Sequence, residues 1–173
     1  MAILKTIPVD LLKQLFVYDA HGHLWWKPRE GAHRWNSRNA RKEAFTAISH
    51  GYYVGRLFGS NHFKHRILWA LHTGEWPTGQ LDHIDHNRLN NEMSNLREAS
   101  QQDNLKNQSL RNDNTSGHCG VCWSANRGKW YARLGKGPGS FLGYFTDKGI
   151  AINTYEDFKV RRGYHHNHGT KYL

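Results

Sequence analysis

The stretch 81–107 constrains this chain more than any other, because it gathers polar, chemically capable side chains around two short apolar runs. Asp82 and His83 stand side by side in the first run, LDHI, and Asn95 opens the second run, NLREA. The residues between the two runs are rich in Asn, which satisfies its own backbone in turns. The stretch therefore predicts two short strands joined by a structured loop.

A helix is expected directly after these two strands, which we place at 81–84 and 95–98. Ser100 with an acid three residues later resembles a capping box, which predicts a helix over 101–109. Asn104 then lies in the first turns of that helix and faces back toward the strands. Because this small unit lacks a large core of its own, it must pack against the helix and strands that precede it.

The residue types in this stretch suit the hydrolysis of a phosphodiester, which needs a base, a cation and in-line positioning. Asp82 and Asn104 offer hard oxygen donors, which suit Mg²⁺ or Mn²⁺. His83 has an ordinary pKa of about 6.5, so a usable fraction is neutral. Neighbouring strand residues point to opposite faces, so Asp82 and His83 share a site only if the strand twists or the phosphate lies at its end. Asn95 either holds the His83 ring or ties down the loop.

The charge balance of the chain favours a polyanionic partner. Lys and Arg number 24 against 14 Asp and Glu, which gives a formal net charge of +10. Nucleic acid is the commonest partner of such a chain, and a solvated basic surface is the alternative. An aromatic content of 13%, with seven Trp, argues against disorder.

We expect a soluble, cytoplasmic protein with reduced thiols. The longest apolar run falls far short of a membrane span, and residues 1–7 lack the pattern of a signal peptide. The two cysteines, Cys119 and Cys122, are too close in sequence to hold a fold together.

The part before this stretch predicts short helices and hairpins, in the order helix 8–15, hairpin 16–27, strands around Gly51 within 43–58, a turn at 59–62 and helix 63–73. The segment 28–42 is polar and basic without a clear period, and is either an exposed loop along DNA or a solvated linker. His65 and His72 are either site residues or histidines partly buried against the core.

The part after it begins with a polar linker at 110–117 and then changes character. Three short strands are expected at 118–125, 129–135 and 140–145, and Thr146 is the expected cap of a helix over 147–162. The predicted buried stripe of that helix is Ile150, Ala151, Thr154, Tyr155 and Phe158. A helix on one face leaves the other sheet face exposed, and the tail after the helix is expected to be flexible.

Several of these motifs resemble those of the HNH endonucleases, in the branch where the last His is replaced by Asn. The resemblance is carried by Asp82-His83 within LDHIDHNRLNN, Asn95 within NLREA, Asn104, and the upstream runs HRILWA and GEWP. The later runs NDNTSGHCGVCW, KWYARL and FLGYF resemble an AP2-like DNA-binding domain. Together these matches extend over about two thirds of the chain.

The resemblance implies an α+β protein with a ββα-metal nuclease fold. It implies His83 as general base, Asp82 and Asn104 as ligands of one divalent ion, and Asn95 as the residue that positions His83. It also implies products with a 3′-hydroxyl and a 5′-phosphate, and a phage-encoded homing or nicking enzyme. His86 departs from the relatives, which commonly carry Gly in this turn, so either the turn differs locally, which we favour, or His86 contacts DNA.

The resemblance further implies a nuclease domain over 1–110, with its ββα-metal core at about 80–109, and an AP2-like domain with the tail over 111–173. The partner would be double-stranded DNA, bound by a monomer or homodimer in the host cytoplasm. Each cation of the exposed sheet face either contacts DNA or is an exposed charge without a specific contact. The candidates are Arg127 and Arg133 for bases, Arg111 and Lys129 for phosphates, and Trp123 or Trp130 beside them.

Two other interpretations stay open. The first is a sequence-specific DNA-binding protein or repressor that kept a nuclease fold without cleavage. The second is a zinc protein, in which Cys119 and Cys122 pair with His118 or with the histidines of the tail.

Overall fold

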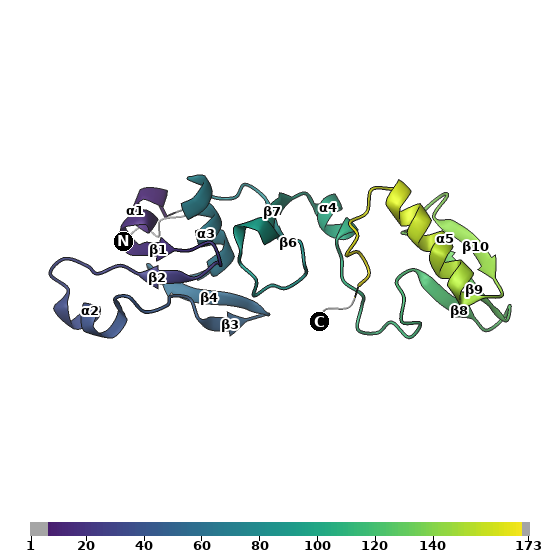
Figure 1. Ribbon diagram of the computed structural model, residues 1–173, viewed down its shortest axis with the longest axis horizontal. Helices are drawn as coiled ribbons and strands as arrows, with labels where there is room; N and C mark the ends of the chain where they lie inside the picture. Colours follow the sequence, from purple (N-terminus) through teal and green to yellow (C-terminus); the bar gives the residue numbers. More distant parts are fainter. Residues whose placement is uncertain (1–6, 171–173) are drawn as a thin grey trace. The chain divides into compact units, whose positions relative to one another are not determined.

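Short antiparallel sheets and short helices build this chain, which is therefore a mixed α and β protein. The computed structural model describes residues 7–170. The prediction that residues 1–7 are not a signal peptide therefore falls almost entirely outside the described residues. The chain divides into two units, Met1–Ser100 and Gln101–Leu173, and Figure 1 labels most of their elements. Across the described residues, no helix combines the length and the apolar character that crossing a membrane requires.

The first unit contains three small sheets, of two, three and two strands, and three α-helices. Its elements are α1 Val9–Leu15, β1 Phe16–Tyr18, β2 Leu24–Trp26, α2 His33–Asn39, β3 Ala47–Ser49, β4 Tyr52–Leu57, β5 Ser60–Phe63, α3 Lys64–Thr73, β6 Gln80–His83, the 3₁₀ turn η1 Met93–Asn95 and β7 Leu96–Ala99. The sheets are β1–β2, β3–β4–β5 and β6–β7, all antiparallel.

The core of the first unit is formed by α1, the β1–β2 hairpin and α3. Leu12, Phe16, Ile67 and Leu68 are almost fully buried there. Helix α3 ends where predicted, because Gly74 adopts a left-handed conformation (φ 85°) as its C-cap. This core supports the site, since α3 runs into the segment that leads to β6.

Two local predictions in the first unit were wrong. The segment 28–42 contains the helix α2, although its polar pattern predicts only a loop or linker. Residues Ser60–Phe63 form the edge strand β5, paired with β4, where turn residues predict only a turn at 59–62. In both places tertiary contacts decide the conformation more than local pattern does.

The second unit is a three-stranded antiparallel sheet with one long helix packed on it. Its elements are α4 Gln101–Lys106, β8 Val121–Ser124, β9 Lys129–Arg133, β10 Phe141–Phe145 and α5 Lys148–Arg161. The strand order is β10–β9–β8, and Val121, Ala132, Ala151 and Tyr155 form the centre of the core. The three strands and the helix were predicted correctly, while α4 is shorter than the predicted helix at 101–109.

Helix α5 corrects two details of the sequence analysis. Its N-cap is Asp147, whose carboxylate accepts a hydrogen bond from the Ile150 backbone N–H at 2.9 Å, and not Thr146. Ile150 is 56% exposed, whereas Lys159 is buried on the core side of the helix. The Lys159 ammonium lies 2.6 Å from Glu156 and donates to the His168 carbonyl at 3.1 Å, so burial does not leave its charge unpaired.

The residues after α5 are not the flexible tail that the sequence predicts. The His165 amide bonds to the Lys106 carbonyl, the Gly169 amide to the Gln108 carbonyl, and the Leu110 amide to the Thr170 carbonyl. These backbone bonds hold the tail beside the segment that follows α4. The compact unit thus begins at Gln101, and the functional boundary at 110/111 stays a prediction.

Candidate active site

The β6–β7 pair supplies the first two predicted site residues. Its register places Asp82 opposite Arg97 and His83 opposite Leu96. His83 is the last residue of β6 and is 5% exposed, and the Asp82 side chain is 15% exposed. Because His83 stands where the strand gives way to the loop, the opposed directions of the two side chains are compatible with one site at the strand end.

The His83 ring is held by Asn91, a residue that the sequence analysis did not single out. His83 Nε2 lies 3.2 Å from Asn91 Oδ1. A carboxamide oxygen only accepts hydrogen bonds, so the neutral tautomer that fits this contact carries its proton on Nε2 and its lone pair on Nδ1. The bond therefore selects the tautomer whose Nδ1 accepts a proton.

Asn91 is itself fixed by the hairpin of the first unit. It is 2% exposed. The turn between β1 and β2 packs so closely that a Cβ on Gly22 would lie 2.5 Å from the Asn91 backbone, and Gly22 also has a positive φ of 77°. Only Gly satisfies both conditions without movement. The sequence offers no signal that distinguishes Asn91 from the other Asn residues of the loop.

Asn95 closes the loop and does so through three side-chain hydrogen bonds. Its Oδ1 accepts from the Asp85 amide at 2.9 Å, and its Nδ2 donates to Asp85 Oδ1 and to the Asn90 carbonyl, each at 2.8 Å. The backbone adds a bond from the Ile84 amide to the Asn95 carbonyl. Of the two roles left open for Asn95, these bonds support the one that ties down the loop.

Asp85 is the centre of the same loop network. Its Oδ1 accepts from the Asn87 amide at 2.7 Å, and its Oδ2 accepts from Asn90 Nδ2 at 2.7 Å. The next residue, His86, has a φ of 66°, a conformation that favours Gly. The turn is thus left-handed at His86, and the two predictions for this residue, a local difference in the turn or a contact with DNA, stay predictions.

Two aromatic rings enclose His83 from the side of the three-stranded sheet and α3. The His65 ring lies 5.2 Å from the His83 ring, edge to face, and the Tyr52 ring lies 5.8 Å from it. Burial lowers the pKa of His83, although Asn91 and the carboxylates of Asp85 and Asp82 act in the opposite direction. Burial, with the nearby His83 and Arg66, lowers the pKa of His65 to about 3. Both rings are therefore neutral at pH 7.

Asp82 is held by a charged partner. Arg97 Nε and Nη2 both donate to Asp82 Oδ2, at 3.0 and 2.8 Å. The guanidinium compensates the charge of the half-buried carboxylate and fixes its orientation. A carboxylate oriented in this way is a suitable oxygen ligand for a hard divalent ion.

The structure places Asn104 on α4, which belongs to the second unit. Asp82 belongs to the first unit, so the joint action of Asp82 and Asn104 remains a prediction. Among residues 7–170, no group of three or more His, Cys, Asp or Glu side chains could hold a metal ion. The assignment of Asp82 and Asn104 as ligands of one divalent ion stays a prediction.

The sheet of the second unit places the predicted DNA-binding residues on two faces. Trp123 and Trp130 are cross-strand partners two positions from Val121 and Ala132, so they lie on the face that α5 covers. Trp130 packs against the core, and only Trp123 is half exposed. The expectation that they occupy the exposed face was wrong. Residues two apart in a strand share a face, so the position of Trp123 two residues after the apolar Val121 could have shown it.

The exposed sheet face carries tyrosines instead. The rings of Tyr131 and Tyr144 lie 6.2 Å apart, and the Arg127 guanidinium lies 4.7 Å from the Tyr144 ring. Arg133 Nε donates to the Gly135 carbonyl, and Lys129 is exposed. This face therefore combines cations with aromatic rings, and sequence reasoning missed its tyrosines.

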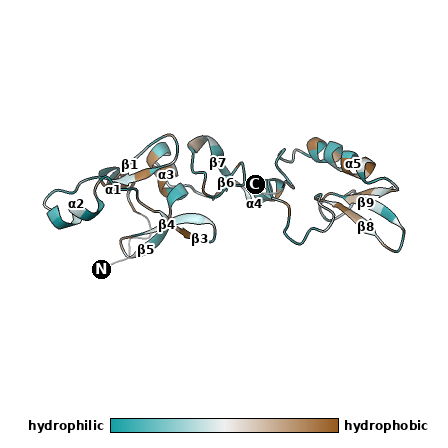
Figure 2. Ribbon diagram, turned by 60° about the horizontal axis from the view of Figure 1, so that its bottom comes forward, coloured by the Kyte–Doolittle hydropathy of each residue, from teal (hydrophilic) through white to brown (hydrophobic). Residues whose placement is uncertain are grey.

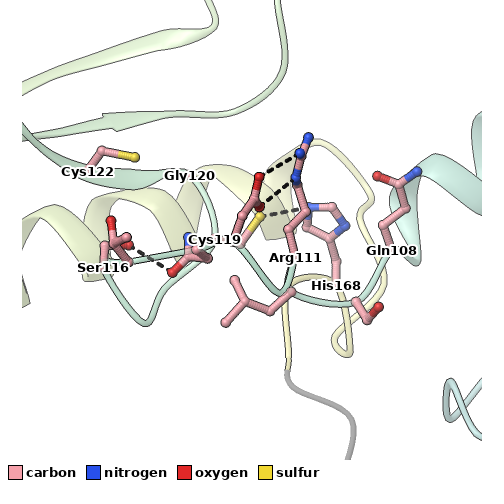
Figure 3. A pocket seen from close by; sticks show the side chains of 12 residues that line it. Gln108, Arg111, Ser116, Cys119, Gly120, Cys122 and His168 are labelled. Carbon is pink, nitrogen blue, oxygen red and sulfur yellow. Dashed lines mark hydrogen bonds and ion pairs between the residues drawn. The ribbon is translucent and has the colours of Figure 1, made fainter.

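A pocket in the second unit is lined by residues that include Cys119, His168 and Cys122, the cross-strand partner of Tyr131 (Figure 3). Cys119 Sγ lies 3.8 Å from His168 Nε2 at its wall, and Arg111 beside it forms an exposed ion pair with Asp113 at 2.7 Å. Arg111 Nε and Nη2 both donate to Asp113, whose carboxylate offsets the charge of the guanidinium.

Comparisons with known proteins support part of the resemblance stated above. Residues 62–106 match the family model described as HNH endonuclease, and this range includes Asp82, His83, Asn95 and Asn104. Protein 3.8 of Escherichia phage T7 is 40% identical over 68 residues, which is 39% of this chain and 56% of that protein. The chain thus spans about half the length of this curated relative. No solved structure matches the chain. The resemblance to HNH endonucleases is thereby confirmed for 62–106, and the chain has a phage homologue.

Proposed function

We propose that this protein is an HNH-type endonuclease that hydrolyses phosphodiester bonds of double-stranded DNA, with one divalent ion per active site. The observation that carries the proposal is the buried His83 ring, held in one tautomer by Asn91 directly beside the Asp82 carboxylate. A general base with a fixed lone pair next to a hard oxygen ligand is the combination that phosphodiester hydrolysis requires.

His83 acts as the general base. Its Nδ1 lone pair takes a proton from a water molecule, whose oxygen bonds to phosphorus while the bond to the 3′ oxygen breaks. The leaving oxygen takes a proton from solvent, so the products carry a 3′-hydroxyl and a 5′-phosphate. The lowered pKa of His83 keeps the ring neutral and ready to accept a proton at neutral pH. Asn95 acts on the reaction through the loop that presents Asn91.

Asp82 and Asn104 are the residues that would hold Mg²⁺ or Mn²⁺, because both present hard oxygen atoms. Such an ion supplies positive charge for the phosphate and the leaving oxygen. Arg97 is a positioning residue, since its two bonds to Asp82 Oδ2 orient the carboxylate.

The second unit is proposed to bind DNA as an AP2-like domain, through the sheet face opposite α5. Arg127 and Arg133 would contact bases, and Lys129 and Arg111 phosphates. Tyr131 and Tyr144 would supply the aromatic contacts first assigned to Trp123 and Trp130. The whole protein would act as a phage homing or nicking enzyme in the host cytoplasm, as a monomer or homodimer.

Supercoiled plasmid incubated with the full chain and Mg²⁺ or Mn²⁺ tests this proposal. We expect conversion to nicked circles that EDTA prevents. His83→Ala should lower the rate by about 1,000-fold, because it removes the base, while DNA affinity stays nearly unchanged. A change of less than threefold in that variant, with the fold intact by circular dichroism, would contradict the base assignment.

The alternative is a DNA-binding protein or repressor without cleavage. The basic balance and the exposed sheet face serve both functions, and the intact set of Asp82, His83, Asn95 and Asn104 favours cleavage. Tight, sequence-dependent DNA binding without nicking at any tested pH or divalent ion would establish the alternative instead.

A further inference from the structure

The segment 28–42, which we call the basic arm, projects from the β1–β2 hairpin with its two ends tied together. The Trp26 amide donates to the Lys42 carbonyl at 3.1 Å, and the Arg41 amide donates to the Trp26 carbonyl at 2.8 Å. The arm therefore leaves and rejoins β2 at one place. Figure 2 shows its helix, α2, as largely hydrophilic, and all seven residues of α2 are at least partly exposed.

The arm is held by a cluster in which Arg29 contacts two tryptophan rings that also contact each other, Trp26 and Trp35, at 5.4 Å between centroids. The Arg29 guanidinium lies 3.8 Å from the Trp35 ring centroid and 5.3 Å from that of Trp26. Asn36 closes the loop, because its Oδ1 accepts from the Arg29 amide at 2.8 Å and its Nδ2 donates to the Arg29 carbonyl at 2.7 Å. The stack and these bonds fix α2, since a helix of one to two turns is marginal by itself.

The charges of the arm oppose its own folding. Arg34 and Arg38 are one helical turn apart, where like charges destabilise a helix. Arg34, Arg38 and Arg41 are exposed, and none of them forms an ion pair with another described residue. Glu30 is the one acid of the segment. A preorganised element that presents repelling, unpaired arginines is complementary to a polyanion.

We propose that the basic arm binds the phosphate backbone of duplex DNA through Arg34, Arg38 and Arg41. The proposal rests on the proposed function for its partner, and it adds a contact outside both the 62–106 match and the sheet of the second unit. Single-stranded partners are bound by aromatic rings that stack on bases. Trp35, the one tryptophan of the arm, is already engaged by Arg29, so the arm offers mainly charge, which suits phosphates that every sequence presents.

Fluorescence anisotropy with a labelled DNA duplex over a series of KCl concentrations tests the arm. The triple variant Arg34→Gln/Arg38→Gln/Arg41→Gln should bind on the order of tenfold more weakly at moderate salt, with a salt slope smaller by about 0.9 per lost contact. Glu30→Gln, which removes the acid of the arm, should bind slightly more tightly. Trp35→Ala keeps every charge and should still weaken binding, because the arm loses its preorganisation.

The controls separate this inference from the proposed function. Arg56→Gln removes an exposed cation of β4 outside the arm and should leave affinity within about twofold of the wild type. Wild-type affinity and slope in the triple variant would overturn the arm's role while leaving the nuclease proposal standing. Duplex binding that depends on the arm, without nicking by the wild type, would instead count against the nuclease alone. Arm-dependent binding that is tighter for structured RNA than for the duplex would overturn the assignment to DNA.

Discussion

The loop between β6 and β7 and the exposed sheet face of the second unit are both polar, but they hold their polar groups in opposite ways. In the loop, His83, Asn91 and Asn95 are buried and bonded to neighbours. On the sheet face, Lys129 and the Tyr131–Tyr144 pair stand at a surface that water reaches.

This difference sets how each region responds to mutation. A buried polar group that loses its partner costs the full penalty of an unmade hydrogen bond, and the geometry of the whole network moves with it. An exposed charge loses only its own screened contribution. A single substitution in the loop should therefore cause a large loss of stability. Each substitution on the sheet face should cause only a small loss of DNA affinity, and these losses should add.

Asn95→Ala gives the largest effect expected from this comparison. It leaves the Asp85 amide and the Asn90 carbonyl without their partner and removes one of the two hydrogen bonds to Asp85 Oδ1, which should lower the free energy of unfolding by about 3 kcal/mol. Chemical denaturation followed by tryptophan fluorescence measures it. Asn61→Ala, on the exposed strand β5, is the matched control and should stay within about 0.5 kcal/mol of the wild type. Equal losses in the two variants would show that the loop network is not special.

The pH dependence of stability also separates a buried polar group, His65, from an exposed one. The pKa of His65 is about 3 in the folded protein against 6.5 ordinarily, so the unfolded chain binds more protons between these values. Stability contributed by neutral His65 is thus present above pH 6.5 and is lost as the pH falls below it, by about 1 kcal/mol per pH unit. We expect His65→Phe to flatten this decline between pH 6.5 and 5, measured by urea denaturation.

The exposed His72 on the same helix provides the control for this experiment. His72→Gln should keep the steep decline of the wild type, because it replaces an exposed side chain and leaves the buried His65 in place. An unchanged slope in His65→Phe would mean that His65 does not remain buried and neutral in solution.

Local patterns were sufficient for the elements whose signals lie in neighbouring residues. The hairpin 16–27, helix α3 and the strands of the second unit follow from period and turn chemistry. Helix α2 could not be predicted, because the contacts of Arg29 with Trp26 and Trp35 hold it and not its own propensities.

In the candidate site too, some residues can be recognised from the local sequence and others are determined by tertiary packing. The adjacent Asp82 and His83 are recognisable in the sequence because the chain itself places them together. The choice of Asn91 as the partner of His83 depends on the packing of Gly22 from a hairpin almost 70 residues earlier. A single sequence does not contain that information, since several Asn residues of the loop are equivalent in their local pattern.

Lys129→Gln gives the smallest effect and tests the other side of the comparison. Lys129 is exposed on β9, so its loss removes at most one screened phosphate contact. Duplex affinity should fall by about threefold and the salt slope by about 0.9, while the melting temperature stays unchanged. Lys136→Gln, in the turn after β9, removes the same charge away from the sheet face and should bind like the wild type. A fall of several degrees in melting temperature for Lys129→Gln would mean that this face stabilises the fold. Substitutions of its cations would then lower stability as substitutions in the β6–β7 loop do.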